Sequence, residues 1–196
     1  MYSTRNTTTE PHRRRRPRLL VAVAALGIVL SGGCAHVIHR PESTGSTSNP
    51  YDDSAHPLSD DLAMAQVVDP AKEIVAAANL DGVSGGFSFA ACNDQGEPPY
   101  RGTVTIHFLI HGDPDAYFEK VQNAMVTAGW NEGAQPGQVF HGSTLNKNGV
   151  TANMSFLPSD HSYGEINLYG ECRNTTNHHD DGKTNGTDIT AQLQAH

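Results

Sequence analysis

The chain has 196 residues, with 13 basic and 21 acidic side chains, a formal net charge of −8 and three cysteines. Six of the basic residues and one acid lie in residues 1–33, so the remainder carries a net charge of about −13. A surface this acidic argues against binding to nucleic acid and against electrostatic attraction to anionic lipids.

The first 33 residues have the three parts of an export signal. Five arginines between residues 13 and 18 form a positive segment, residues 19–30 are apolar and uncharged, and the small residues 31–33 precede a cysteine. This order is the secretory pattern, and the apolar run is shorter than the ~20 residues of a spanning helix. We therefore expect a lipoprotein signal peptide at 1–33. The alternative is an uncleaved N-terminal anchor.

Cys34 is the predicted lipidation site. Its position after the small residues resembles a bacterial lipobox, in which the thiol receives diacylglycerol and becomes the mature N-terminus. The usual leucine is displaced by one residue, since Ser31 stands in its place and Leu30 precedes it. Residues 15–19 (RRPRL) also resemble a twin-arginine signal interrupted by proline, so the export route stays open. Several acyl chains, palmitate among them, would hold the protein on the extracytoplasmic side of the cell membrane.

Lipid on Cys34 would leave two cysteines, Cys92 and Cys172. Outside the cytoplasm such a pair tends to oxidise. The predicted disulfide would close a loop of about 80 residues, which is worth roughly 4 kcal/mol in the chain-entropy model. The alternative is two free buried thiols.

The remaining sequence predicts one folded domain between two polar segments. Residues 34–58 are rich in Ser, Thr and Pro, which predicts a disordered tether, and residues 173–196 predict a polar disordered tail with at most a frayed helix near 189–193. Residues 59–172 form the predicted globular domain.

Two helices are expected in this domain. Ser59 can cap the first, which Asp69 and Pro70 would kink or restart before it ends near residues 79–82. The second begins after Asp113 and Pro114 and runs to Gly129, with apolar side chains at helical spacing.

The other segments alternate in polarity like strands. They are a strand marked by Phe87 and Phe89, and strands at 103–110, 138–146, 150–157 and 163–172, with a hairpin turn at residues 148–149. The order predicts an α+β fold with an antiparallel sheet of about five strands and two helices on one face.

Four stretches resemble the LppJ family of mycobacterial lipoproteins. They are residues 49–58 (NPYDDSAHPL), 93–100 (NDQGEPPY), 149–155 (GVTANMS) and 170–176 (GECRNTT). The likeness covers nearly the whole chain after the signal. It implies an exported, lipid-anchored envelope protein, and it implies no activity and no catalytic residues.

Residues that could carry chemistry do not form a recognisable catalytic motif, so we expect a protein that is not an enzyme and needs no cofactor. His107 and His111 lie four apart on one strand, about 13 Å, which is too far for one metal ion. Residues 178–181 (HHDD) suit weak binding of a divalent ion or, more simply, a solvated polar run. A metal-dependent hydrolase is therefore the third of three hypotheses.

The first hypothesis is a binding domain. On one parity of the last strand lie Tyr163, Glu165, Asn167 and Tyr169, and His107 extends this face on the neighbouring strand. Tyrosines on an exposed sheet face suit contact with an envelope protein or glycan, although they are also common in strands. The second hypothesis is a carrier or sensor of a small apolar ligand in a helix–sheet cavity, where the small residues 76–78 and 85–86 would leave room or allow close packing.

Overall fold

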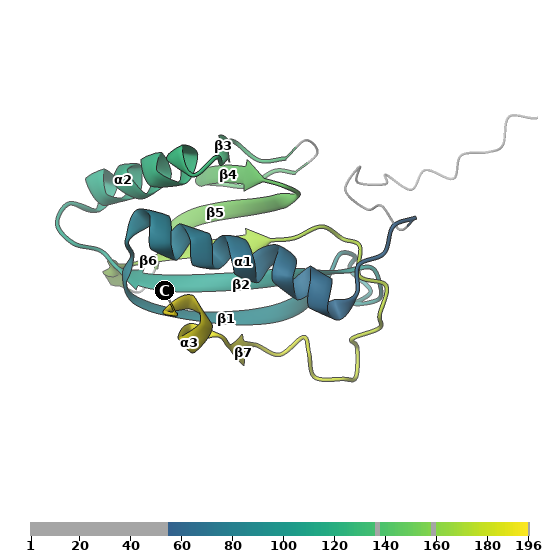
Figure 1. The fold of residues 1–196 in the computed structure, drawn as a ribbon. Helices are drawn as coiled ribbons and strands as arrows, with labels where there is room; N and C mark the ends of the chain where they lie inside the picture. The colour runs from purple at the N-terminus through teal and green to yellow at the C-terminus, as the bar shows by residue number, and fades with distance from the viewer. Residues whose placement is uncertain (1–54, 136–137, 158–159, 196) are drawn as a thin grey trace, which may run out of the picture. The chain divides into compact units, whose positions relative to one another are not determined.

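The computed structural model describes residues 55–135, 138–157 and 160–195. Within these residues the chain forms three helices and seven strands (Figure 1). The bounds are α1 Asp60–Ala78, β1 Asp81–Ala91, β2 Tyr100–Leu109, α2 Pro114–Thr127, β3 Asn131–Glu132, β4 Ser143–Lys147, β5 Val150–Leu157, β6 Asp160–Tyr169, β7 Thr187–Asp188 and α3 Thr190–Leu193.

The strands form one sheet in the order β3-β4-β5-β6-β2-β1-β7, and the paired strands run antiparallel. This confirms the predicted α+β class. The sheet has seven strands rather than about five, because β3 and β7 have two residues each. Two residues are too few to show the alternation by which a strand is recognised in a sequence.

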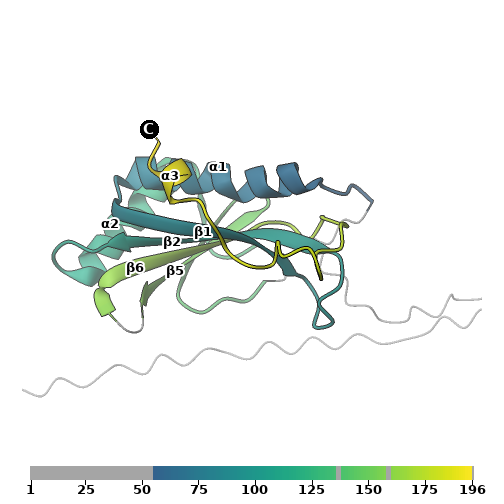
Figure 2. The same cartoon turned by 90° about the horizontal axis from the view of Figure 1, so that it is seen from below.

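The helices pack on one face of the sheet, which we call the inner face. In Figure 2, α1 and α3 lie on the same side of β1 and β2. From α2, the Phe118 ring packs edge-on against Phe156 of β5, with centroids 4.7 Å apart. On the inner face of β2, Val104, Ile106 and Phe108 are buried, as their alternation predicted. Burial of this one face leaves the opposite, outer face of the sheet for polar side chains.

Local sequence explains where the helices begin. The Ser59 hydroxyl accepts a hydrogen bond from the Leu62 N–H, and the Asp113 carboxylate accepts one from the Ala116 N–H. Of the two predictions for Pro70, the restart is wrong, because α1 continues through this residue. Proline removes one helical hydrogen bond, and the burial of neighbouring Val68 and Ala71 against the sheet offsets that loss.

The hairpin prediction is confirmed, whereas one strand is shorter than predicted. Asn148 and Gly149 have φ angles of 48° and 83°, which suit a tight turn between β4 and β5. The predicted strand 138–146 begins only at Ser143. Gln138 accepts a hydrogen bond from the Thr151 hydroxyl at 2.6 Å, across the outer face of β5.

The prediction of a disordered tail from residue 173 is wrong. β7 pairs with β1, and Ile189 and Leu193 are 1% and 0% exposed. Gly85 of β1 permits this packing, since a Cβ there would lie 2.5 Å from the Leu193 side chain. The frayed helix expected near residues 189–193 is present as α3, and the sheet gives its two apolar side chains a place to be buried.

The ends of the predicted domain also change. The Leu58 N–H donates to the Arg173 carbonyl at 2.8 Å. Leu58, which was predicted to end the disordered tether, therefore belongs to the folded domain. Cys34 and the rest of the tether to residue 54 lie outside the described residues. In the described part of the chain, no helix is long and apolar enough to cross a membrane.

A disulfide joins Cys92, after β1, to Cys172, after β6, with their Cα atoms 6.0 Å apart. Close to it, Tyr100 and Asn174 exchange two backbone hydrogen bonds of 2.7 and 3.0 Å. Asn174 is 0% exposed. The disulfide therefore lies where the C-terminal segment first attaches to the sheet.

Candidate functional sites

The outer face of the sheet carries a row of hydrogen-bonded polar side chains on β2 and β6. The register places Thr105 opposite Asn167 and His107 opposite Glu165. The Thr105 hydroxyl donates to the Asn167 side-chain oxygen at 2.7 Å, and the Asn167 amide donates to Glu165 at 2.5 Å. The His107 Nε2 lies 3.1 Å from the second Glu165 oxygen. Each group fixes the orientation of the next, so the row presents an ordered polar surface.

Two tyrosines lie on the outer face of β6, Tyr163 in its first half and Tyr169 at its end. Tyr163 is exposed and pairs with Leu109. Tyr169 is more enclosed, because the Phe140 ring lies 5.2 Å from its ring and the Arg101 guanidinium lies 5.0 Å from its centroid. Burial raises the pKa of Tyr169. The structure thus gathers all five predicted face residues on one surface, and it covers the Tyr169 end with the loop before β4.

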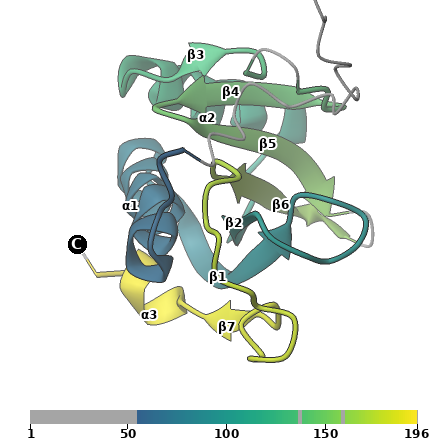
Figure 3. The same ribbon diagram turned by 90° about the vertical axis from the view of Figure 1, so that its right-hand side faces the viewer.

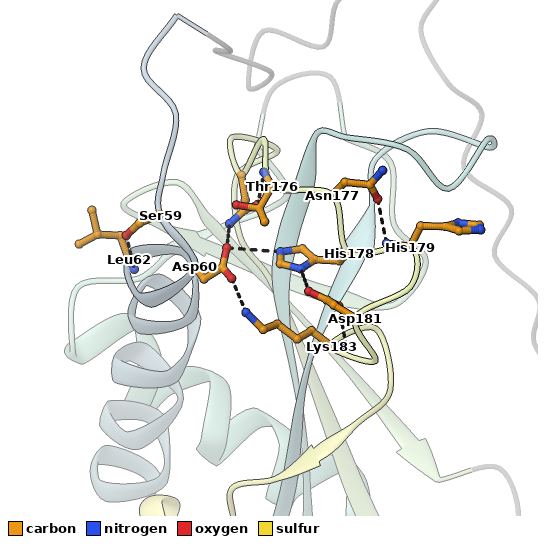
Figure 4. A network of polar contacts seen from close by, with 10 residues as sticks. Ser59, Asp60, Leu62, Thr176, Asn177, His178, His179, Asp181 and Lys183 are labelled. Carbon is orange, nitrogen blue, oxygen red and sulfur yellow. Dashed lines mark hydrogen bonds and ion pairs between the residues drawn. The ribbon is translucent and has the colours of Figure 1, made fainter.

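A second polar cluster lies where the C-terminal segment meets the start of α1, and Figure 4 shows it. We call it the clasp and define it by Asp60, His178, Asp181 and Lys183. His178 is 0% exposed. Its Nδ1 lies 2.7 Å from Asp181, and its Nε2 lies 3.4 Å from Asp60. Lys183 donates to the other Asp60 oxygen at 2.5 Å, so both elements are joined through one carboxylate.

Two aromatic rings of the sheet pack against His178. Its ring stacks on Phe89 with centroids 4.1 Å apart and meets Tyr100 edge-on at 5.0 Å. Sequence reasoning missed this cluster, since it took residues 178–181 for a solvated run. The spacing of His178 and Asp181 was visible in the sequence, but their partner Asp60 is more than a hundred residues away.

Because of the clasp, the stability of the fold depends on pH in the acidic range. Burial alone would raise the pKa of Asp60, but hydrogen bonds from Lys183, Asn174 and Thr176, together with nearby His178, lower it from 3.8 to about 2. The hydrogen bond with His178 likewise lowers the pKa of Asp181. A carboxyl group of this kind stabilises the fold above its unfolded pKa, and its contribution is lost as the pH falls through its folded pKa.

We therefore expect the free energy of unfolding to fall between about pH 4 and pH 2, with about 1–2 kcal/mol from Asp60 after allowance for its partial exposure. Urea unfolding at about pH 5, 3 and 2 measures this loss. The Asp60→Asn variant should lose less stability over the same range. An equal loss in both proteins would contradict the role given to Asp60.

The described surface has several hollows, and two of them differ clearly in their lining. One, of about 510 Å³, is polar and open, and Asp81 in its wall lies 3.1 Å from the His111 Nε2. The other, of about 240 Å³, lies on the inner side of the sheet against Met64, Phe87 and Phe89. The first has Asp81, Asp113 and Lys120 in its wall, whereas the second has apolar side chains beside charged ones, so their ligands would differ in chemistry.

The histidines considered for a metal have separate partners. His107 bonds to Glu165 and His111 to Asp81. Among the described residues, no three His, Cys, Asp or Glu side chains converge in a way that could hold a metal ion. The geometry therefore gives no support to the metal-dependent hydrolase.

These features define a class of protein, a small disulfide-linked α+β domain with a polar sheet face opposite its helices. A family model described as "Putative lipoprotein LppJ" matches residues 59–192, and the chain belongs to this LppJ family of lipoproteins. The match extends well beyond residue 172, in agreement with the ordered C-terminal segment.

Relatives of the same name support this membership. The LppJ lipoprotein of Mycobacterium tuberculosis strain H37Rv is 62% identical over 181 residues, which cover 92% of this chain and 95% of the relative. That of Mycobacterium bovis is 61% identical over 186 residues, covering 95% and 97%. These names state a class, lipoprotein, and no activity. No solved structure matches the chain closely enough to be compared with it.

Proposed function

We propose that the protein is a non-catalytic binding domain, held by lipid on Cys34 at the extracytoplasmic face of the cell membrane. Membership of a lipoprotein family supports the anchor. The export signal before Cys34 supports the side of the membrane, and so does the Cys92–Cys172 disulfide, since such bonds persist in oxidising compartments. The acidic charge keeps the domain soluble beside an anionic surface.

The outer face of the sheet is the proposed binding surface. The observation that carries this proposal is the row Thr105, Asn167, Glu165 and His107, whose side chains are already ordered by one another. Ordered polar groups lose little conformational freedom on binding. Tyr163 beside them adds an exposed aromatic ring of the kind that contributes strongly at interfaces. A partner in the envelope, protein or glycan, would meet this surface.

The test is partner capture by the mature lipidated protein from envelope extracts. The double variant His107→Ala, Tyr163→Ala should retain at most about one fifth of the captured partner, since a central interface residue is worth more than ~1 kcal/mol. The control is Val126→Ala, which changes an exposed apolar side chain on α2. An unchanged partner list in the double variant would exclude the outer face as the binding surface.

A second candidate function is the carrying of a small apolar ligand between helices and sheet. The small residues that suggested it do not form the cavity, because Leu193 fills the space at Gly85, and Ala76 and Ala77 are exposed. The 240 Å³ pocket at Phe87 and Phe89 is the observation that favours this function.

A further inference from the structure

The pocket on the inner side of the sheet lies between the start of α1 and the C-terminal segment. Its wall on one side is formed by Asp60, Asp61 and Met64 of α1, and on the other by Lys183 and Thr187. These two elements flank β1, as Figure 3 shows. We call this space the α1–β7 pocket. It is separate from the outer face, which lies on the opposite side of the sheet.

The floor of the α1–β7 pocket is aromatic. Phe87 and Phe89 lie edge-to-face with centroids 5.1 Å apart, and both are almost fully buried. Met64 is partly buried beside them and packs against the core. A thioether side chain is flexible and polarisable, so it adapts to ligands of different shape. This floor suits the apolar body of a ligand.

The charge at the mouth of the pocket is negative. Lys183 is already paired with Asp60, whose low pKa keeps it ionised at neutral pH. The carboxylate of Asp61 is exposed in the first turn of α1 and interacts with Lys183 only at longer range. Phenylalanine faces also attract cations. With two carboxylates and one ammonium group among the lining side chains, the mouth keeps one net negative charge, which favours a cationic head over an anionic one.

We propose that the α1–β7 pocket binds a small amphiphilic cation, a hydrophobic amine or ammonium compound. Its apolar body lies against Met64, Phe87 and Phe89, and its positive head faces Asp61. This inference rests on the second candidate function, the carrying of a small apolar ligand, and gives that ligand a charge. It is independent of partner binding by the outer face.

Three probes of equal chain length separate the contributions of shape and charge: octylammonium, octanol and octanoate. Each is titrated onto the mature lipidated protein in nanodiscs of neutral lipid, with empty nanodiscs as a control for partitioning. The readout is the NMR signal of the methionine methyl groups. Met64 lines the pocket, whereas Met125 and Met154 are buried in the core and serve as internal references.

We expect octylammonium to shift the Met64 methyl signal with saturation and to bind at least about tenfold more tightly than octanol or octanoate, while the reference signals stay in place. The Asp61→Asn variant should lose most of this preference. Asp69→Asn is the matched control, because Asp69 is exposed on the same helix but does not line the pocket.

Each other outcome contradicts a part of the proposal. An unmoved Met64 signal with all three probes would exclude the pocket as a ligand site. Equal binding of the three probes would overturn the choice of a cation, and a preference unchanged in Asp61→Asn would overturn the role of Asp61. None of these results would affect partner capture by the outer face, so the two proposals fail separately.

Discussion

The His178→Ala variant is expected to lose about 3–5 kcal/mol of unfolding free energy, which is the range for truncating a large buried side chain. The imidazole is fully buried, stacks on Phe89 and lies between Asp60 and Asp181. Its removal leaves a cavity against the Phe89 ring and takes the ring nitrogen away from both carboxylates. Urea unfolding at neutral pH measures the loss.

The adjacent His179→Ala is the matched control. Its side chain is 59% exposed and lies 3.8 Å from Asp180, so its loss should change stability by no more than about 0.5 kcal/mol. Hydrogen exchange should also show the difference, because the C-terminal segment after residue 174 should open first in His178→Ala. Equal stability of the two variants would mean that the clasp does not hold this segment.

The clasp marks the limit of what the sequence could predict. A histidine in a run of polar residues has the composition of a solvated tail, and nothing local distinguishes it from one. His178 is buried because three other elements surround it: β1 with Phe89, β2 with Tyr100 and α1 with Asp60. Such a site depends on the tertiary arrangement, which periodicity and composition do not contain.

The outer face of the sheet could be predicted, by contrast. Alternation along β2 and β6 is a local property, and it placed His107, Glu165 and Asn167 on one surface before any pairing was known. What could not be predicted was the register, which decides that His107 meets Glu165 rather than a residue two positions away. The loop that brings Phe140 over Tyr169 was also missed, because its residues alternate like a strand.

The α1–β7 pocket has one part that the sequence could predict and one part that it could not. Phe87 and Phe89 were assigned to a strand, yet their exposure to a cavity depends on how far α3 covers β1. Leu193 covers Gly85, and the segment before β7 leaves the space above the two rings partly open. The C-terminal segment therefore determines both the stability of this edge of the fold and its capacity to bind a ligand.

Loss of the disulfide is expected to have an effect of similar size. The Cys92→Ser, Cys172→Ser double variant should be destabilised by about 4 kcal/mol, because the bond closes a loop with a sequence separation of 80. Cys172 is also 5% exposed, so serine would place a hydroxyl in a buried position. The backbone pairing of Tyr100 with Asn174 lies beside the bond, so the C-terminal segment should become less protected from exchange.

Treatment with a reductant separates the effect of losing the disulfide from the effect of replacing the two cysteines. Reduction should lower the urea midpoint of the wild-type protein almost to that of the double variant and should leave the double variant unchanged. If the wild-type midpoint does not respond, and both thiols react with an alkylating reagent in unfolded protein that was never reduced, the alternative of two free buried thiols is correct. A fold that depends on this bond needs an oxidising compartment, so the same measurement bears on the side of the membrane on which the domain folds.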